Sequence, residues 1–199
     1  RYFAEGAGQL WEQQALCKAR VAHGSQRVAD AVLAAVTKAT FSQRWRRSNV
    51  DEIRQMRRRL EETTTPGDLK RGYGGIVDVE FLVQMLQLKH GRRRPKLRQP
   101  NTIAALDELR RAGCLEPGDH EFFSSAYRTL RTIEGRLRLM NSTARDTLPE
   151  DPVELTKLAQ LLSYPSGQAL LKHCRQLSEQ TRRRFEMIFE REGGSGPQK

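Results

Sequence analysis

Apolar residues recur at the spacing of a helix along almost the whole chain. No stretch alternates as a strand would, and no internal repeat is visible. The apolar spacing predicts helices over about residues 2–19, 25–41, 49–62, 76–90, 101–113, 117–140, 152–163 and 166–192. We therefore predict an all-α fold, a helical bundle of about eight helices.

Several of these boundaries coincide with residues that begin or end helices. Asn49 is followed three residues later by Glu52, the spacing of a capping box. Asn101 is a second candidate cap, for a helix that Gly113 would end. Asp151 precedes a proline at a first helical position. We expect helices to begin at these three places.

The predicted helix 76–90 is unusual because apolar residues cover all of its faces, which favours a central, buried position. It nevertheless carries Asp78, Glu80, Gln84 and Gln87. At about 100° per residue, the two carboxylates point in different directions, whereas Glu80 and Gln84 share one stripe. A carboxylate in apolar surroundings needs a cation or a ligand. Two interpretations stay open: pairing with neighbouring Arg or Lys, or a ligand site that works through Mg²⁺ or ligand hydroxyls.

A glycine-rich loop precedes this helix. Lys70 and Arg71 flank Gly72, Gly74 and Gly75, whose N–H groups lie just before a helix N-terminus. Such a loop can cradle an anion, although a tight turn needs glycines as well. It is not a phosphate loop of the Walker type, since no GK[ST] follows, and no strand precedes it as a dinucleotide-binding fingerprint requires. The Gly-Gly and Asp-x-Glu pairs are also too close together for a nucleotidyltransferase active site.

The remaining chemistry-bearing residues form no complete catalytic constellation. The histidines do not pair at zinc spacing, and no serine stands in a nucleophile elbow. Cys17, Cys114 and Cys174 are far apart and odd in number, which fits semi-buried thiols in a reducing cytosol. No apolar run is long enough to span a membrane, and no signal peptide opens the chain, so we expect a cytoplasmic protein.

The net charge of +11 favours a phosphate-bearing or polyanionic partner. Four arginine clusters contribute to it, and each of them could equally be a solvated helix face. They lie at residues 44–47, 57–59, 92–94 and 182–184.

Two motifs resemble those of the glutamine synthetase adenylyltransferase family. The run from Trp11 to Arg20 resembles its WERQALxKAR motif, and the run from Lys70 to Gln84 resembles its KxGxGGIxDIEFxxQ motif. Shorter similarities follow at residues 53–57, 127–134 and 148–149, so the resemblance covers nearly the whole chain. The sequence departs from the family pattern at Ser25, where Asp is common, and at Val79, where Ile is usual.

The resemblance implies a particular place in a larger enzyme. Enzymes of this family contain two modules, each with a nucleotidyltransferase domain followed by a helical domain. One module attaches AMP from ATP to a tyrosine of glutamine synthetase, and the other removes it by phosphorolysis. The PII signal protein and glutamine select between them. By this resemblance, residues 1–192 form a helical domain excised from such a module, and residues 193–199 form a disordered tail.

The resemblance also implies roles for individual residues. ATP and Mg²⁺ would bind in the full-length enzyme, with the metals on the upstream nucleotidyltransferase domain, so the isolated chain should be inactive. Lys18 and Arg20 would reach phosphates from the end of the first helix. Lys70 with the loop of Gly74 and Gly75 would add cationic and N–H contacts. Asp78 and Glu80 would bind a ribose hydroxyl or orient Lys or Arg, with Gln84 beside them. Trp11 and Glu12 are instead expected in the core and in a buried pair.

Two rival functions stay open. The chain could be a protein-docking module for glutamine synthetase or PII, without nucleotide contacts, in which the motifs serve only the fold. It could also be a nucleic-acid-binding helical domain, as its charge allows. We rank nucleic acid last because no reader motif or aromatic platform is present. Which of the two family modules the chain represents is open as well.

Overall fold

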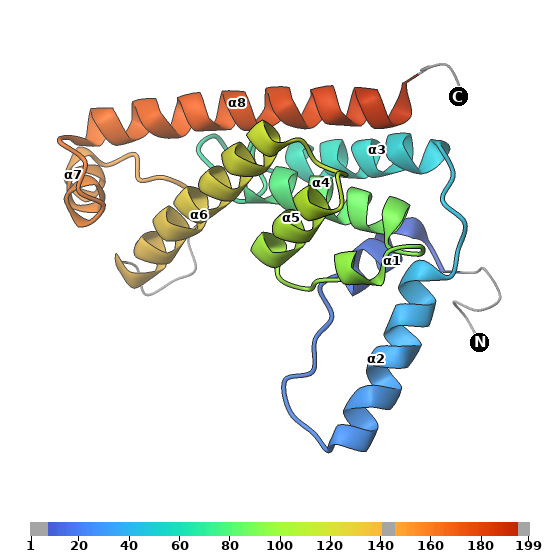
Figure 1. The fold of residues 1–199 in the computed structure, drawn as a ribbon. Coiled ribbons are helices and arrows are strands. Elements are labelled where there is room, and N and C mark those ends of the chain that lie inside the picture. The colour runs from blue at the N-terminus through green and yellow to red at the C-terminus, as the bar shows by residue number, and fades with distance from the viewer. Residues whose placement is uncertain (1–7, 141–145, 195–199) are drawn as a thin grey trace.

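The computed structural model describes residues 8–140 and 146–194. These residues form eight α-helices and one 3₁₀ helix (Figure 1). The helices are α1 (Leu10–Leu16), α2 (Gln26–Phe41), α3 (Ser48–Glu62), α4 (Ile76–His90), η1 (Pro95–Leu97), α5 (Thr102–Arg111), α6 (Pro117–Met140), α7 (Pro152–Leu161) and α8 (Gly167–Gly193). The predicted all-α fold of about eight helices is confirmed.

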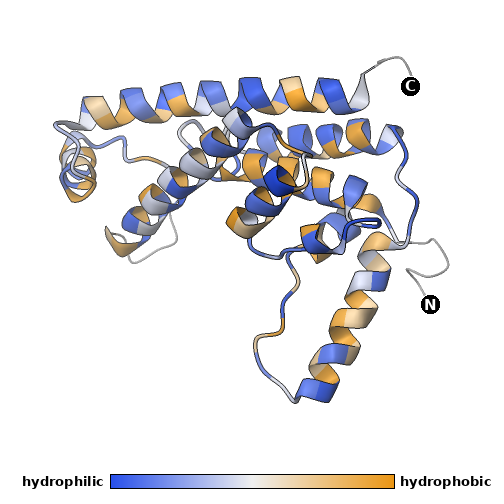
Figure 2. Cartoon of the chain, in the orientation of Figure 1, coloured by the Kyte–Doolittle hydropathy of each residue, from blue (hydrophilic) through white to orange (hydrophobic). Residues whose placement is uncertain are grey.

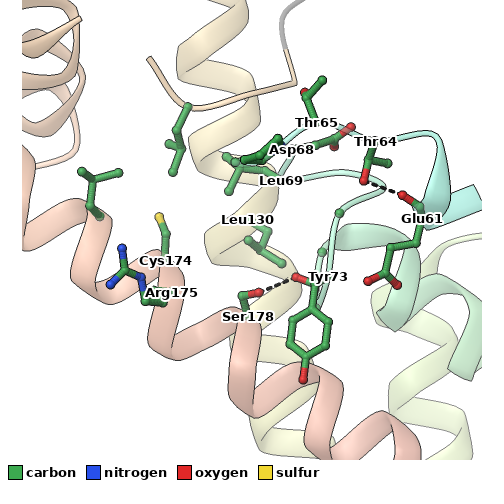
Figure 3. A pocket seen from close by; sticks show the side chains of 17 residues that line it. Glu61, Thr64, Thr65, Asp68, Leu69, Tyr73, Leu130, Cys174, Arg175 and Ser178 are labelled. Atoms are coloured by element: carbon green, nitrogen blue, oxygen red, sulfur yellow. Dashed lines mark hydrogen bonds between the residues drawn. The ribbon is translucent and has the colours of Figure 1, made fainter. Parts of the chain in front are cut away.

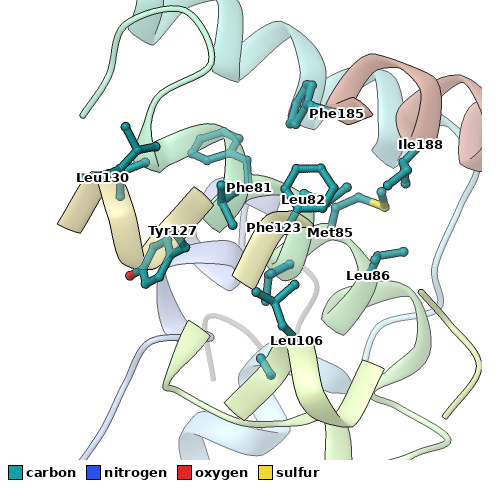
Figure 4. Packing of buried hydrophobic residues seen from close by; sticks show 14 of the residues in the cluster. Phe81, Leu82, Met85, Leu86, Leu106, Phe123, Tyr127, Leu130, Phe185 and Ile188 are labelled. Atoms are coloured by element: carbon teal, nitrogen blue, oxygen red, sulfur yellow. The ribbon is translucent and has the colours of Figure 1, made fainter. Parts of the chain in front are cut away.

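Helix α4 lies at the centre of the fold, as its all-round apolar sequence predicts. It packs against α1, α3, α5, α6 and α8. Figure 4 shows α4 side chains such as Leu82 and Met85 among side chains of α5, α6 and α8, including Leu106, Phe123 and Phe185. Asp78, Gln84 and Gln87 of α4 are therefore buried inside a continuous apolar cluster, so each of them needs a partner.

The helix caps were predicted with mixed success. The Asn101 side chain accepts a hydrogen bond from Ala104 N–H at 3.1 Å, and Asp151 accepts from Val153 and Glu154 N–H at 3.0 and 2.8 Å. Gly113 follows α5 with a φ of 67°, the left-handed conformation expected of a C-terminal glycine. The cap predicted at Asn49 is wrong. Its side chain accepts from Arg46 N–H at 2.6 Å, closing a turn from which α3 begins one residue earlier.

The first helix is shorter than predicted. Helix α1 ends at Leu16, and the chain continues in turns through Lys18, so Lys18 and Arg20 both lie beyond the helix. Residues 1–7 and 195–199 fall outside the described residues, and with them most of the predicted tail. Gly193 is the last residue of α8. The domain limits proposed from the sequence stay predictions.

Helix α2 stands away from the body of the molecule (Figure 1). Figure 2 shows apolar residues alternating with polar ones along this helix. Part of its apolar stripe is open to solvent, since Val28 and Val32 are 51% and 50% exposed. None of the described helices combines the length and the apolar character needed to cross a lipid bilayer.

Candidate functional site

Asp78, in the first turn of α4, is completely buried and surrounded by cations. Its Oδ1 accepts from Arg57 Nε, and its Oδ2 accepts from Arg182 Nε at 2.7 Å and from Gly74 N–H at 3.0 Å. Burial raises the pKa of this carboxyl, while the two guanidiniums act in the opposite direction. Asp78 therefore joins the glycine loop to α3 and α8, and its oxygens are already taken by protein donors.

The arginines that bind Asp78 also hold the glycine loop in place. Arg57 is fully buried and also donates to the carbonyl oxygen of Gly72 at 2.7 Å. Arg182 pairs with Glu61 of α3, and its guanidinium lies over the Tyr73 ring at 4.7 Å. Cations from two helices thus hold both the backbone and an aromatic side chain of the loop. We call Glu61, Arg57, Asp78 and Arg182 the Asp78 network.

The glycine loop packs directly on α8. Gly74 has a φ of 66°, and a Cβ at that position would lie 1.9 Å from the carbonyl oxygen of Ser178. Ser178 in turn donates its hydroxyl to the carbonyl of Tyr73 (Figure 3). The N–H groups of the loop have protein acceptors: Gly72 donates to Asp68, Gly74 to Asp78 and Gly75 to Gly72. Lys70 Nζ lies 3.6 Å from Asp146.

A hollow of about 520 Å³ lies on the outer side of this loop, between the loop, α6 and α8. Figure 3 shows Tyr73, Leu130, Cys174 and Ser178 around it. Burial raises the pKa of the Cys174 thiol to about 11, so this side chain stays protonated at neutral pH. Its lining combines apolar side chains such as Leu148 and Leu171 with polar ones such as Asp68 and Arg175.

Glu80 lies on another side of α4, in a more open setting. Its Oε1 accepts from the Tyr127 hydroxyl at 2.9 Å and from Lys18 Nζ at 3.2 Å. Lys18 Nζ also donates to Thr102 Oγ1 at 2.7 Å. The Arg131 guanidinium lies 5.7 Å from the centre of the Tyr127 ring. We call these five residues, Lys18, Glu80, Thr102, Tyr127 and Arg131, the Glu80 cluster.

The surroundings of the Glu80 cluster keep the Tyr127 phenol protonated. Burial raises the pKa of Tyr127, and the charge of Glu80 adds to that rise, so the phenol remains a donor at neutral pH. The side chains of Lys18 and Glu80 are 37% and 21% exposed, so solvent reaches both. Four segments of the chain thus place a carboxylate, two hydroxyls and two cations at one accessible spot.

The structure brings together only some of the residues singled out in the sequence. Lys18 meets Glu80, and Gly74 meets Asp78, but these pairs lie on different sides of α4. Arg20 is exposed and forms no ion pair within the described part of the chain. Gln84 is buried in α4. The ligand roles of these residues stay predictions.

The core position expected for Trp11 is wrong, since its side chain is 51% exposed. Helix α1 is short and buries Leu10, Gln13 and Gln14, so position 11 points outward. Glu12 accepts from Gln9 N–H at 2.8 Å in a capping box, a local bond at the start of α1.

Sequence reasoning did not assign the two arginines that hold Asp78. A signal was present for both of them. Arg57 falls between Ile53 and Leu60 on the apolar stripe of α3, and Arg182 falls three residues before Phe185 on that of α8. An arginine within an apolar stripe indicates a buried charge that needs a carboxylate.

No metal site is evident within residues 8–140 and 146–194, where no three His, Cys, Asp or Glu side chains come together. Asp78 does not fit a magnesium ligand, because guanidinium and N–H donors occupy its oxygens.

Comparison with known proteins places this arrangement in a family. A family model described as GlnD PII-uridylyltransferase matches residues 40–190, from the end of α2 into the last turns of α8. The curated relatives carry the name bifunctional glutamine synthetase adenylyltransferase/adenylyl-removing enzyme. The protein of Leifsonia xyli subsp. xyli is 35% identical over 187 residues, which are 91% of this chain and 18% of the relative.

Two further relatives agree with this result. The Streptomyces coelicolor protein is 34% identical over 187 residues, 91% of this chain and 19% of its own length. The Bradyrhizobium diazoefficiens protein is 28% identical over 205 residues, 100% of this chain and 21% of its own length. The chain thus spans about a fifth of the length of these relatives. With the family model covering most of its helices, the chain belongs to the PII-uridylyltransferase family and is similar to the bifunctional glutamine synthetase adenylyltransferases.

Proposed function

We propose that this chain is the helical part of a nucleotidyltransferase that attaches AMP to, or removes it from, a tyrosine of glutamine synthetase, and so regulates nitrogen assimilation. The similarity to the bifunctional enzymes along 91% of the chain supports this proposal. On this proposal the chain alone is inactive. An upstream nucleotidyltransferase domain supplies the remaining groups, together with ATP and Mg²⁺, and the PII protein acts on the whole enzyme.

The observation that carries the proposal is the open Glu80 cluster. A carboxylate that is 21% exposed and is held by an amine and a phenol can still accept from a ligand hydroxyl. Lys18 contacts Glu80 directly, and Arg131, which pairs with Glu134 at 2.6 Å, lies by the Tyr127 ring. Both add positive charge that a phosphate-bearing ligand requires. Asp78, by contrast, is closed off by Arg57 and Arg182.

These differences divide the work among the motif residues. Glu80 positions the Lys18 amine, and Lys18 and Arg20 approach the phosphates. Asp78, Gly74 and Gly75 hold the start of α4 so that Glu80 faces the ligand. Lys70 supports the position of Glu80 from the glycine loop, and Gln84 supports it from the buried side of α4. The metals belong to the upstream domain, because the carboxylate of Asp78 does not fit them.

The test uses the full-length enzyme that contains this chain, with Glu80→Gln as the variant. We expect kcat/KM for AMP transfer to glutamine synthetase to fall at least about tenfold, because a neutral amide cannot hold the Lys18 ammonium by charge. Glu121→Gln on the exposed side of α6 is the matched control, and it should leave kcat and KM unchanged. If Glu80→Gln keeps kcat and KM for ATP, the ligand role of the cluster is abandoned.

A second candidate is a docking module for glutamine synthetase or PII. One observation favours it: Lys18 and Lys70 are both already paired with carboxylates, Glu80 and Asp146. Calorimetric titration of the chain with ATP and, separately, with glutamine synthetase distinguishes the two functions. Binding of glutamine synthetase without ATP binding, together with an unchanged Glu80→Gln enzyme, would favour docking.

A further inference from the structure

Two of the arginine clusters noted in the sequence meet at one place in the fold. The connection between α2 and α3 supplies Arg44 and Trp45, and the end of α4 with its following loop supplies His90, Arg92, Arg93 and Arg94. Together they line a hollow of about 710 Å³, which we call the basic hollow. Because 45 residues or more separate the two clusters in the sequence, only the fold reveals this concentration of charge.

The positive charge of the basic hollow is largely uncompensated. Within the described ranges, no carboxylate forms an ion pair with Arg44, Arg92 or Arg93. Glu192, the acidic group that acts on His90, already pairs with Lys89 at 2.5 Å. Burial and the charge of Lys89 lower the pKa of His90, so the imidazole stays neutral at pH 7. Like charges gathered in a concave surface raise the local concentration of anions.

The backbone that presents these arginines is held in place beforehand. Gln87 Nε2 donates to the carbonyls of Leu97 and Gln99 at 2.7 and 2.8 Å. Arg98 Nε donates to the carbonyl of Gly91 at 2.8 Å. A Cβ at Gly91 would lie 2.8 Å from a Phe41 ring carbon, so the loop packs closely on α2. A ligand therefore meets a preformed loop and loses little free energy in ordering it.

The size and composition of the hollow limit what it can hold. Its volume falls in the range of small-molecule sites, about 300–1,000 Å³. Trp45 is partly buried against the core and contributes an aromatic surface beside the guanidiniums. Guanidinium groups bind phosphate oxygens in pairs of parallel hydrogen bonds. A compact hollow suits a short phosphate chain better than the long backbone of a nucleic acid.

We propose that the basic hollow binds a small ligand with two or more adjacent phosphates, either inorganic or as part of a nucleotide. Arg44, Arg92 and Arg93 neutralise the phosphates, Arg94 shapes the rim through its bond to the carbonyl of Ala112, and Trp45 borders the ligand. The site shares no residue with the Glu80 cluster. It therefore stands or falls independently of the function proposed above.

The chain offers a direct optical test. It contains two tryptophans, and the exposed Trp11 can be replaced in Trp11→Phe, which leaves Trp45 as the single reporter. In this background, inorganic tripolyphosphate and ATP are titrated separately at about 0.1 M salt, where charges more than about 10 Å away are largely screened. We expect a saturable change in Trp45 fluorescence. Arg92→Glu with Arg93→Glu should weaken binding about tenfold or more.

The matched control is Arg58→Glu with Arg59→Glu, which changes the net charge equally at an exposed pair on α3 outside the hollow. It should change the affinity by less than about threefold, since screened charges contribute little at a distance. Circular dichroism checks folding, and the milder Arg92→Gln with Arg93→Gln replaces the charge reversal if that variant unfolds.

The outcomes decide both the site and the ligand. Equal affinity for tripolyphosphate and ATP supports a site for the phosphate chain alone, and tighter ATP binding supports a nucleotide site. The proposal is overturned by the lack of a saturable signal, by equal weakening in both double variants, or by tighter binding of polyglutamate or duplex DNA.

Discussion

Asp78 and Glu80 are two residues apart on α4, yet their surroundings differ in almost every respect. Asp78 is 0% exposed and accepts from two guanidiniums and a backbone N–H. Glu80 is 21% exposed and accepts from one amine and one phenol. The helix turns by about 100° per residue, so the first carboxylate faces α3 and α8 and the second faces α5 and α6. The comparison teaches that one short acidic motif can serve both packing and surface chemistry.

The largest expected effect is that of Asp78→Asn. This change leaves the buried guanidinium of Arg57 with only its longer pairing to Glu61, at 3.5 Å, and Arg182 loses a partner as well. Breaking a buried ion pair by removing one partner costs about 3–5 kcal/mol. We expect the free energy of unfolding, measured with urea, to fall by that amount.

Asp119→Asn is the control for this change. It removes the same charge from a pair with Arg184 that is partly exposed, so it should cost about 1 kcal/mol or less. If Asp78→Asn were no more destabilising than this control, the Asp78 network would not stabilise the fold. Asp78 would then again be a candidate for binding a ligand.

Gly74→Ala changes the glycine loop that binds Asp78, and it should have the next largest effect on the free energy of unfolding. The left-handed backbone costs about 1–2 kcal/mol with a Cβ, and this Cβ would also overlap the Ser178 carbonyl oxygen. We expect a loss of more than about 2 kcal/mol in the same urea experiment.

Gly113→Ala is the matched control for Gly74→Ala. Gly113 has a φ of 67°, like Gly74, but a Cβ added there would have nothing within 4 Å. It should therefore lose only the conformational part, about 1–2 kcal/mol. Equal losses at the two glycines would mean that the loop can move away from α8 at little cost.

Glu80→Gln should have the smallest effect on stability. The new amide oxygen can still accept from the Tyr127 hydroxyl, and the lost ion pair with Lys18 is partly exposed to solvent. We expect a change of about 1 kcal/mol or less in the free energy of unfolding. A loss close to that of Asp78→Asn would show that Glu80 is also structural, and the contrast between the two carboxylates would disappear.

The sequence was most informative where local signals decide the structure. Helices α4 and α6 begin and end where the apolar spacing, Gly91 and Pro117 indicate. The different directions of Asp78 and Glu80 also follow from helix geometry alone. What lies opposite each carboxylate does not, because that depends on how distant segments pack. Tyr127 meets Glu80 across 47 residues of chain, and no local pattern encodes that distance.

The same limit explains the errors at the start of the chain. The run around Trp11 reads as a long helix, but α1 stops at Leu16, and tertiary contacts then direct Lys18 to Glu80 and Thr102. Helix propensity alone cannot predict such an ending. The basic hollow could not be predicted from the sequence either, since each arginine cluster by itself resembles an ordinary solvated surface.

The long reach of Arg182 has a consequence for how the chain is made. Arg57 lies 21 residues from Asp78, whereas Arg182 lies 104 residues beyond it. During synthesis, Asp78 and Arg57 leave the ribosome long before α8 exists to cover them. Asp78 at the start of α4 therefore lacks its Arg182 partner until α8 has been synthesised and has packed onto it, because contacts between distant segments form late. We expect α8 to act as the closing element of folding, so that chains released before Arg182 would reach no stable native state.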